Sequence, residues 1–302
     1  MTDKARKALH EFIELTGKTQ RQISKEIGLS TATISQFLNA VYTGDNEDVA
    51  RTINLYLAVG KQRLNSVQAC NFYEELYNTQ EVLFAVSYAH RKGDIVLVCG
   101  DAGAGKTTAL MHYCENNVNV IFVTANSCAK SASAILNLIS NAMGGRQLTG
   151  RRDEMIQRLI HSLEGSNRLI IIDEADHLTL DALQAVRAIN DEAHVGIVLS
   201  GNEKIYYQMK YGSKSPKFQQ LRTRILVRKW VHNDYTPDEI NAIFPNLNEK
   251  CSAFLLNLAI GESLRTARKL FDIAAENASS NNEPLNIKHL KETQDEMLGG
   301  EL

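Results

Sequence analysis

Eight residues near the middle of the chain combine glycines, a lysine and a threonine at a spacing that suits phosphate binding. The stretch Gly100 to Thr107 fits the pattern G-x-x-x-x-G-K-[ST] and follows a short apolar run, Asp94 to Cys99. Such glycines let backbone N–H groups face phosphates, while Lys106 supplies positive charge and the Thr107 hydroxyl can bind Mg²⁺. We expect ATP and Mg²⁺ here, with the nucleotide held by Gly100, Asp101, Ala102, Gly103, Ala104, Gly105, Lys106, Thr107 and Thr108.

A pair of acidic residues ends another apolar run farther along the chain. Leu169 to Ile172 is followed directly by Asp173 and Glu174. A carboxylate at the end of a buried strand beside the phosphate loop can hold Mg²⁺, and an adjacent glutamate can orient the attacking water. We therefore assign Mg²⁺ binding to Thr107 and Asp173, and activation of water to Glu174. The alternative is a pair of solvated acids that cap the next helix.

Further polar side chains are candidates for completing a hydrolytic site. Asn202 follows the next apolar run, so its amide can contact the γ-phosphate or the attacking water; alternatively, it only starts a helix. Arg222 and Arg224 precede the last apolar run, where arginines commonly reach into a neighbouring subunit's nucleotide. Arg265 opens a later helix and could reach the γ-phosphate of its own subunit. For the arginines, the alternative is an ordinary surface position.

These residues must be positioned by an alternation of strands and helices. Apolar runs predict buried strands at Asp94 to Cys99, Val118 to Thr124, Arg168 to Ile172, Val195 to Ser200 and Ile225 to Val231. Helical patterns lie between the runs, at Lys106 to Glu115, Ala132 to Met143, Asp153 to Leu163 and Asp181 to Asn190. The alternation predicts the α/β class: a parallel-sheet P-loop ATPase core with helices on both faces.

Changes of pattern divide the chain into four parts. We predict an amino-terminal domain over 1–60, a linker over 61–70, the α/β core over 71–232 and a helical lid over 233–302. The linker is placed where the large apolar repeat of the first part is lost. With 302 residues, of which 44% are hydrophobic and 23% charged, the composition is that of an ordinary globular protein of several domains.

The amino-terminal part matches a helix-turn-helix between Gln20 and Leu38. Gly28 permits a tight turn between two short helices, and the second helix would present Thr31, Thr33 and Gln36, with Ser30 and Ser35, to a DNA groove. That helix contains no Lys or Arg, which favours low-specificity binding through the DNA backbone. The alternative is a three-helix module that binds only protein.

A long run without acidic residues is the most basic part of the chain. Between Lys204 and Lys229 lie eight Lys and Arg residues and no Asp or Glu. In a chain of net charge −2, this run can serve as a track for DNA phosphates, or it is simply a solvated face. The candidates for DNA contact in the run are Lys204, Lys210, Lys214 and Lys217.

The remaining composition excludes several classes of protein. The five cysteines are odd in number and form no Cys-x-x-Cys pair, which argues against a disulfide framework or a zinc site, and we expect buried thiols. No apolar run approaches the roughly 20 residues that cross a bilayer, and the charged start lacks a signal-peptide core. We therefore expect a cytoplasmic protein without a membrane partner.

Taken together, the sequence resembles the family of the bacteriophage Mu transposition protein B and its prophage relatives. The resemblance covers nearly the whole chain and rests on Ile23 to Phe37, Tyr42 to Glu47, Val98 to Gly100, Ile171 to Leu178, Gly196 to Asn202 and Leu264-Arg265. It implies an AAA+ ATPase with an amino-terminal helix-turn-helix that binds double-stranded DNA with little specificity. Such a protein assembles on target DNA as a homo-oligomer or helical filament, delivers the DNA to a transposase and stimulates strand transfer. Arg151 and Arg152 are DNA-contact candidates in a basic cluster less arginine-rich than the family leads us to expect.

Two other functions remain open. One is an AAA+ helicase loader or replication initiator, which binding to a replicative helicase would favour. The other is a regulator whose nucleotide site only switches shape, which tight ATP binding without turnover would favour.

Overall fold

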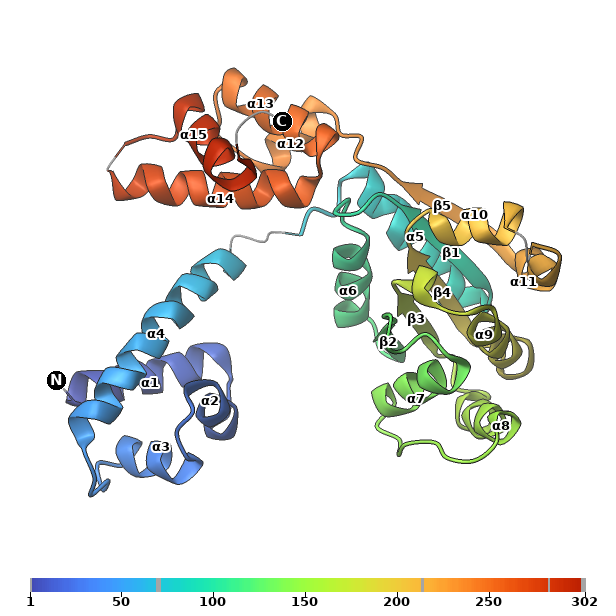
Figure 1. Ribbon diagram of the computed structural model, residues 1–302, viewed down its shortest axis with the longest axis horizontal. Helices are drawn as coiled ribbons and strands as arrows, with labels where there is room; N and C mark the ends of the chain where they lie inside the picture. The colour runs from blue at the N-terminus through green and yellow to red at the C-terminus, as the bar shows by residue number, and fades with distance from the viewer. Residues whose placement is uncertain (1, 69–71, 213–214, 282, 300–302) are drawn as a thin grey trace. The chain divides into compact units, whose positions relative to one another are not determined.

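The chain forms two compact units, which divide at Asn71 and Phe72 (Figure 1). The computed structural model describes residues 2–68, 72–212, 215–281 and 283–299, with only the backbone described for 58–68.

The amino-terminal unit is a bundle of four helices in its described part. They are α1 (Thr2–Thr16), α2 (Gln20–Ile27), α3 (Thr31–Leu38) and α4 (Asn46–Gln68). All four contribute to one apolar core, whose fully buried members include Leu9, Ile23, Ile34, Phe37 and Ile53. The predicted pair of short helices is therefore present as α2 and α3, joined by a turn at Gly28.

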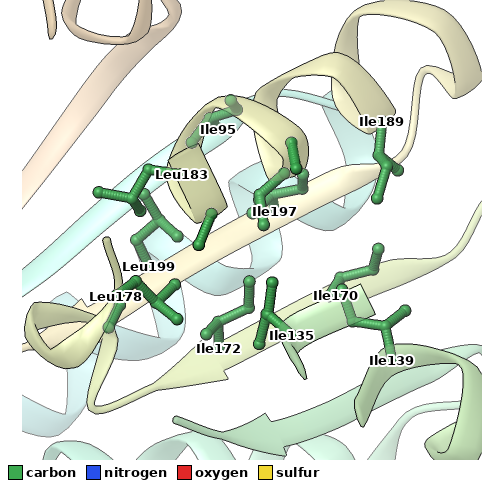
Figure 2. Packing of buried hydrophobic residues seen from close by; sticks show 14 of the residues in the cluster. Ile95, Ile135, Ile139, Ile170, Ile172, Leu178, Leu183, Ile189, Ile197 and Leu199 are labelled. Atoms are coloured by element: carbon green, nitrogen blue, oxygen red, sulfur yellow. The ribbon is translucent and has the colours of Figure 1, made fainter. Parts of the chain in front are cut away.

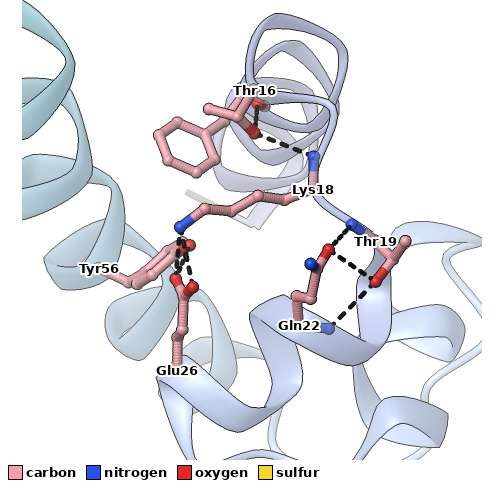
Figure 3. Close-up of polar contacts among 7 residues, drawn as sticks. Thr16, Lys18, Thr19, Gln22, Glu26 and Tyr56 are labelled. Atoms are coloured by element: carbon pink, nitrogen blue, oxygen red, sulfur yellow. Dashed lines mark hydrogen bonds and ion pairs between the residues drawn. The ribbon is translucent and has the colours of Figure 1, made fainter. Parts of the chain in front are cut away.

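Polar contacts fix α2 against the helices on either side of it (Figure 3). Thr19 and Gln22 form a reciprocal capping box at the start of α2, in which Thr19 N donates to Gln22 Oε1 over 2.8 Å. Near the other end, Glu26 accepts from Lys18 Nζ at 2.7 Å and from the Tyr56 hydroxyl at 2.7 Å. Because Tyr56 belongs to α4, these contacts join three segments of the bundle.

The segment predicted as a linker is largely helical. α4 runs 23 residues to Gln68, so it covers 61–68 of the predicted linker 61–70, and the last two residues lie outside the described part. The sequence in this span contains no proline and is rich in residues that tolerate the helix well, so losing the apolar repeat did not end the helix.

The second unit is built on a five-stranded sheet. The strands are β1 (Ile95–Gly100), β2 (Val120–Thr124), β3 (Leu169–Asp173), β4 (Gly196–Gly201) and β5 (Ile225–Val231), in the spatial order β2-β3-β4-β1-β5. Every pairing is parallel. The carboxyl ends of β1, β3 and β4 therefore meet at one edge, where ligands bind in open α/β sheets.

Helices cover both faces of the sheet. They are α5 (Tyr77–Lys92), α6 (Lys106–Asn116), α7 (Ala132–Ala142), α8 (Arg152–Leu163), α9 (Leu180–Ala193), α10 (Lys204–Tyr211) and α11 (Gln219–Arg224), with 3₁₀ turns at Ala175–His177 and Ser215–Phe218. Along β1, Ile95 shares a core with residues of α7 and α9 (Figure 2), as Leu97 does, while Val96 and Val98 share a core with residues of α5 and α6. This alternation explains why β1 is apolar throughout.

The carboxyl-terminal part is a small helical lid with its own core. Its helices are α12 (Pro237–Ile243), α13 (Glu249–Gly261), α14 (Leu264–Ser280) and α15 (Ile287–Leu298). Leu76, which precedes α5, is buried in this core, and the Tyr73 hydroxyl donates to Ile243 O at 2.9 Å. Helix α5 begins at Tyr77, directly after this contact with the lid.

The fold class predicted from the sequence is confirmed in its architecture: an α/β core on a parallel sheet, with amino-terminal helices and a carboxyl-terminal helical region. Among the described residues, no helix combines the length and apolarity needed to cross a membrane. The expectation of buried cysteines holds for Cys99 and Cys251 but is wrong for Cys128, which is exposed in the loop after β2; Cys114 is half-buried. Cys70 lies outside the described residues.

Candidate functional site

The glycine-rich loop joins β1 to α6 and turns sharply at both ends. Gly100 has a φ of +146°, and a Cβ at this position would collide with the backbone of Val231. Asp101 N donates to Val231 O at 2.8 Å, which fixes the start of the loop to the end of β5. Only a residue without a side chain permits this approach, so the packing of the loop against β5 requires a glycine at the first position of the motif.

Lys106 folds back over the loop. Its ammonium group donates to the carbonyl oxygens of Gly100 at 2.9 Å and Asp101 at 2.6 Å. Burial lowers the pKa of Lys106, and the negative charges of Asp173, Glu174 and Asp101 oppose that decrease. The ammonium therefore lies within a loop that can surround phosphates, close to acidic groups at the edge of the sheet.

The two predicted Mg²⁺ ligands lie in direct contact. Thr107 Oγ1 donates to Asp173 Oδ2 at 2.7 Å, and the other carboxylate oxygen accepts from Ser200 Oγ at 2.8 Å. Asp173 is 3% exposed and Ser200 is fully buried at the end of the neighbouring strand β4. Hydroxyl and carboxylate oxygens are ligands that Mg²⁺ prefers, so Thr107 and Asp173 fit this ion. Ser200 was not predicted, because its contact depends on β3 lying beside β4.

Glu174 is exposed and has an unusual backbone. Its φ of +54° is in the left-handed region, at the point where β3 gives way to the 3₁₀ turn. A non-glycine residue in this region costs of order 1–3 kcal/mol, and such residues cluster at functional sites. At this turn Glu174 is exposed, whereas Asp173, one residue earlier, is buried.

Asn202 occupies the strand end where it was predicted, but its side chain is engaged locally. Its Oδ1 accepts from Lys204 N at 3.2 Å, and its backbone N–H donates to Asp176 Oδ1 at 3.1 Å. Asn202 thus lies one residue before Glu203, the N-cap of α10, and its contact with the γ-phosphate or the attacking water stays a prediction.

Arg265 lies near the phosphate loop. A Cβ placed on Gly103, whose φ is +76°, would meet Ser263 Oγ at 2.8 Å and Arg265 Cβ at 3.3 Å. The first turn of α14 therefore packs directly on the loop, and contact of the Arg265 side chain with the γ-phosphate stays a prediction.

Arg222 and Arg224 lie near the amino ends of the strands, opposite the carboxyl ends where the phosphate loop begins. β5 is parallel to β1, with Ile225 beside Ile95 and Val231 beside Gly100. Because Arg224 precedes Ile225, the length of a six-residue strand, about 20 Å, separates its backbone from the phosphate loop. Arg224 Nε pairs with Asp191 Oδ1 at 2.9 Å, while Arg222 is half-buried and its carbonyl accepts from Arg228.

The candidates for DNA contact in the basic run are distributed over α10 and the turn that follows. Lys204 begins α10, Lys210 Nζ lies 4.8 Å from the ring centroid of Tyr211, Lys217 is exposed, and Lys214 lies outside the described residues. Acidic residues from elsewhere reduce the charge of the run: besides the pair of Arg224 with Asp191, Lys229 pairs with Glu81 at 2.6 Å.

The other DNA-contact candidates are also on the surface. Arg151 and Arg152 flank the start of α8 and make long pairs, 3.6 Å each, with Asp153 and Asp181. In the amino-terminal unit, Ser30 caps α3 by accepting from Thr33 N at 3.0 Å. The hydroxyls of Ser30, Thr31 and Thr33 are all engaged in local hydrogen bonds, and Gln36 is exposed.

Comparison with known proteins places this site in a family. A family model described as an AAA domain matches residues 89–209. The ATP-dependent target DNA activator B of Escherichia phage Mu is 31% identical over 233 residues, 77% of this chain and 74% of that protein. The activator B of Escherichia phage D108 matches to the same extent. The Mu-like prophage FluMu DNA transposition protein B of Haemophilus influenzae is 32% identical over 68% of this chain and 72% of that protein.

Solved structures share the fold at low sequence identity. The ORC2 protein of Aeropyrum pernix in its ADP form matches with a TM-score of 0.53 and 16% identity, over 72% of this chain and 66% of that chain. A chain of the Drosophila ORC bound to DNA matches with a TM-score of 0.55 and 14% identity, over 78% and 65%. The chain thus spans slightly less than two thirds of these structures. With its AAA domain, its phosphate loop and its likeness to the phage activators, this chain belongs to the family of Mu-type transposition proteins B.

Proposed function

We propose that this protein is an ATPase that assembles on double-stranded target DNA in its ATP state, delivers that DNA to a transposase and stimulates strand transfer. The observation that carries the proposal is the contact of Thr107 with Asp173 at 2.7 Å, beside the ammonium of Lys106. A hydroxyl, a carboxylate and a lysine meet at the carboxyl edge of the sheet, which is the arrangement needed for ATP with Mg²⁺. The names of the phage relatives support the link to target DNA.

Each residue of the site has a distinct chemical task in this proposal. The backbone of Gly100 to Thr107 and the Lys106 ammonium bind the phosphates, and Thr107 and Asp173 hold Mg²⁺. Glu174, exposed at the end of β3, orients and activates the attacking water. Arg265, close to the loop, binds the γ-phosphate of its own subunit.

The far edge of the sheet supports assembly of several subunits. Arg222 and Arg224 are a strand length away from their own phosphate loop, too far for contact with the same nucleotide. Arginines in such positions can stabilise transition-state charge when they are supplied by a neighbouring molecule. We therefore assign them to a neighbour's site, with Arg222 the less engaged of the two because Asp191 binds Arg224.

DNA binding is assigned to surfaces of both units. The basic run with Lys204, Lys210 and Lys217 and the surface arginines Arg151 and Arg152 contact phosphates. In the amino-terminal unit, α2 and α3 contact the duplex mainly through its backbone. Three of the hydroxyl and amide candidates are already engaged within α2 and α3, which is consistent with low sequence specificity.

The test is electron microscopy of the protein on linear double-stranded DNA with ATP, with ADP and without nucleotide. We expect ordered assemblies only with ATP, and none for Lys106→Ala, because the loop loses its phosphate-facing charge. Lys92→Ala, at the end of α5, is the matched control and should assemble normally. Equal assembly of wild-type protein in all three conditions, or normal assembly of Lys106→Ala, would contradict the proposal.

A further inference from the structure

Asn233 lies where the chain leaves the sheet and enters the lid. β5 ends at Val231 and α12 begins at Pro237, so the peptide between them is the covalent connection of the two parts of this unit. Asn233 is half-buried in that connection, and the sequence did not single it out. Two neighbouring contacts hold its backbone: Asn78 Nδ2 donates to His232 O at 2.7 Å, and Asn233 N donates to Asp101 Oδ2 at 2.9 Å.

The side chain of Asn233 bridges the phosphate loop and the lid. Its Nδ2 donates to Ala102 O, within the loop, at 3.4 Å and to Glu262 O, in the turn before α14, at 3.3 Å. Its Oδ1 accepts from the Tyr235 hydroxyl at 3.5 Å. Both N–H groups of one amide are therefore used, one on each side of the boundary between loop and lid.

The chemistry of this contact is specific to an amide. Each carbonyl oxygen needs a donor, and the NH₂ group of asparagine offers two donors in one plane. An aspartate has the same shape but offers only acceptors when ionised, so it would place negative charge against two carbonyl oxygens. Glu262 is followed by Ser263, the N-cap of α14, and then by Arg265, so the bridge ends beside the lid residues that pack on the loop.

We propose that Asn233 is a positioning residue that couples the phosphate loop to the turn between α13 and α14. Nucleotide that orders the loop also fixes Ala102 O, and through the Asn233 amide it fixes Glu262 and the start of α14, where Arg265 lies. The inference rests on the proposed nucleotide binding and adds the path by which the lid responds to it. Without the amide, the loop still binds phosphates but the lid no longer responds.

The test is hydrogen–deuterium exchange of the full chain with and without ADP and Mg²⁺. In wild-type protein, ADP should slow exchange both in 100–107 and in 261–267. In Asn233→Asp the slowing in 100–107 should remain, while the slowing in 261–267 falls by about 5- to 30-fold, the effect of losing one or two hydrogen bonds. A merely structural role would change exchange in the lid equally with and without ADP.

Asn233→Ala removes the same donors without adding charge, so it keeps the test valid if Asn233→Asp is unstable. Asn277→Ala, at an exposed position of α14, is the control and should respond as wild type does. An undiminished response of 261–267 in both Asn233 variants would overturn the coupling, while nucleotide binding would stand. If wild-type protein showed no slowing in 100–107, nucleotide binding itself would fail, and the coupling with it.

Discussion

Asp173 is an ionisable group in a nearly dry position, and its partners decide how it can act. Burying a lone carboxylate is costly, but Thr107 and Ser200 each donate to one of its oxygens, at 2.7 and 2.8 Å. Two neutral donors offset part of the cost and hold the side chain in one orientation. The carboxylate is therefore held in an orientation that suits a cation, while Glu174, one residue later, is exposed.

At this scale the sharpest prediction concerns Glu174→Gln. Glutamine keeps the shape of the side chain but lacks the charge that activates water, so turnover of ATP should fall about 10²–10⁴-fold. ATP binding should persist because Lys106, Thr107 and Asp173 are unchanged. The protein should then remain in its ATP state, and its complexes with DNA should live longer. The measurements are the ATPase rate and the dissociation time of DNA complexes.

Glu115→Gln, exposed at the end of α6, is the control for this variant and should behave as wild type. DNA binding by Glu174→Gln should still weaken with added salt, because the phosphate contacts are untouched. Near-normal turnover would remove Glu174 from the mechanism. Slow ATP turnover together with short-lived DNA complexes would show that ATP hydrolysis does not control release of the protein from DNA.

At the scale of elements, β1 to β4 were predictable from contiguous apolar runs, because both faces of a parallel sheet are covered; the run of β5, at the edge of the sheet, is interrupted by Arg228 and Lys229. The order of the strands was not, since it depends on pairing between distant segments. For the same reason the local sequence did not predict the contact of Ser200 with Asp173 or the bridge made by Asn233. The end of α4 was not predictable either: an apolar repeat reports packing, and the loss of that repeat after Leu57 did not mark the end of the helix, which runs to Gln68.

The arginines before β5 give the prediction that belongs to this scale. With Arg222 and Arg224 both changed to Ala, a subunit should bind ATP but hydrolyse it poorly and assemble badly. Mixed with Lys106→Ala, it should regain ATPase activity, because some interfaces then pair an intact arginine with an intact phosphate loop. The measurement is the ATPase rate across mixing ratios.

Arg187→Ala on α9 is a suitable control, because Arg187 also pairs with Asp191 but is not assigned to a nucleotide. The Arg187→Ala variant should hydrolyse ATP normally without being mixed with the Lys106→Ala variant. Absence of recovery at every ratio, from variants shown to co-assemble, would instead place the two arginines in the site of their own subunit.

For the whole molecule, the division into two units predicts what removal of the first one does. The sheet, the phosphate loop and the lid all lie within Phe72–Leu302. Deleting 1–71, rather than the 1–60 that the sequence alone would have chosen, also removes all of α4 and should leave a folded protein that binds ATP.

Circular dichroism measures whether the deletion variant folds, and titration with ATP measures whether it binds the nucleotide. Its affinity for DNA should fall because α2 and α3 are gone. A variant that folds but binds no ATP would show that the first unit contributes to the nucleotide site.

The opposite positions of the phosphate loop and the arginines have a kinetic consequence. Under the proposed assignment of Arg222 and Arg224 to a neighbour's nucleotide, the catalytic centre needs the carboxyl ends of one sheet and the amino ends of another, so it is complete only between two molecules. The rate of ATP hydrolysis per protomer is then not a constant of the protein. It rises with protein concentration until assembly is complete, and DNA, by gathering protomers on one template, shifts that rise to lower concentration.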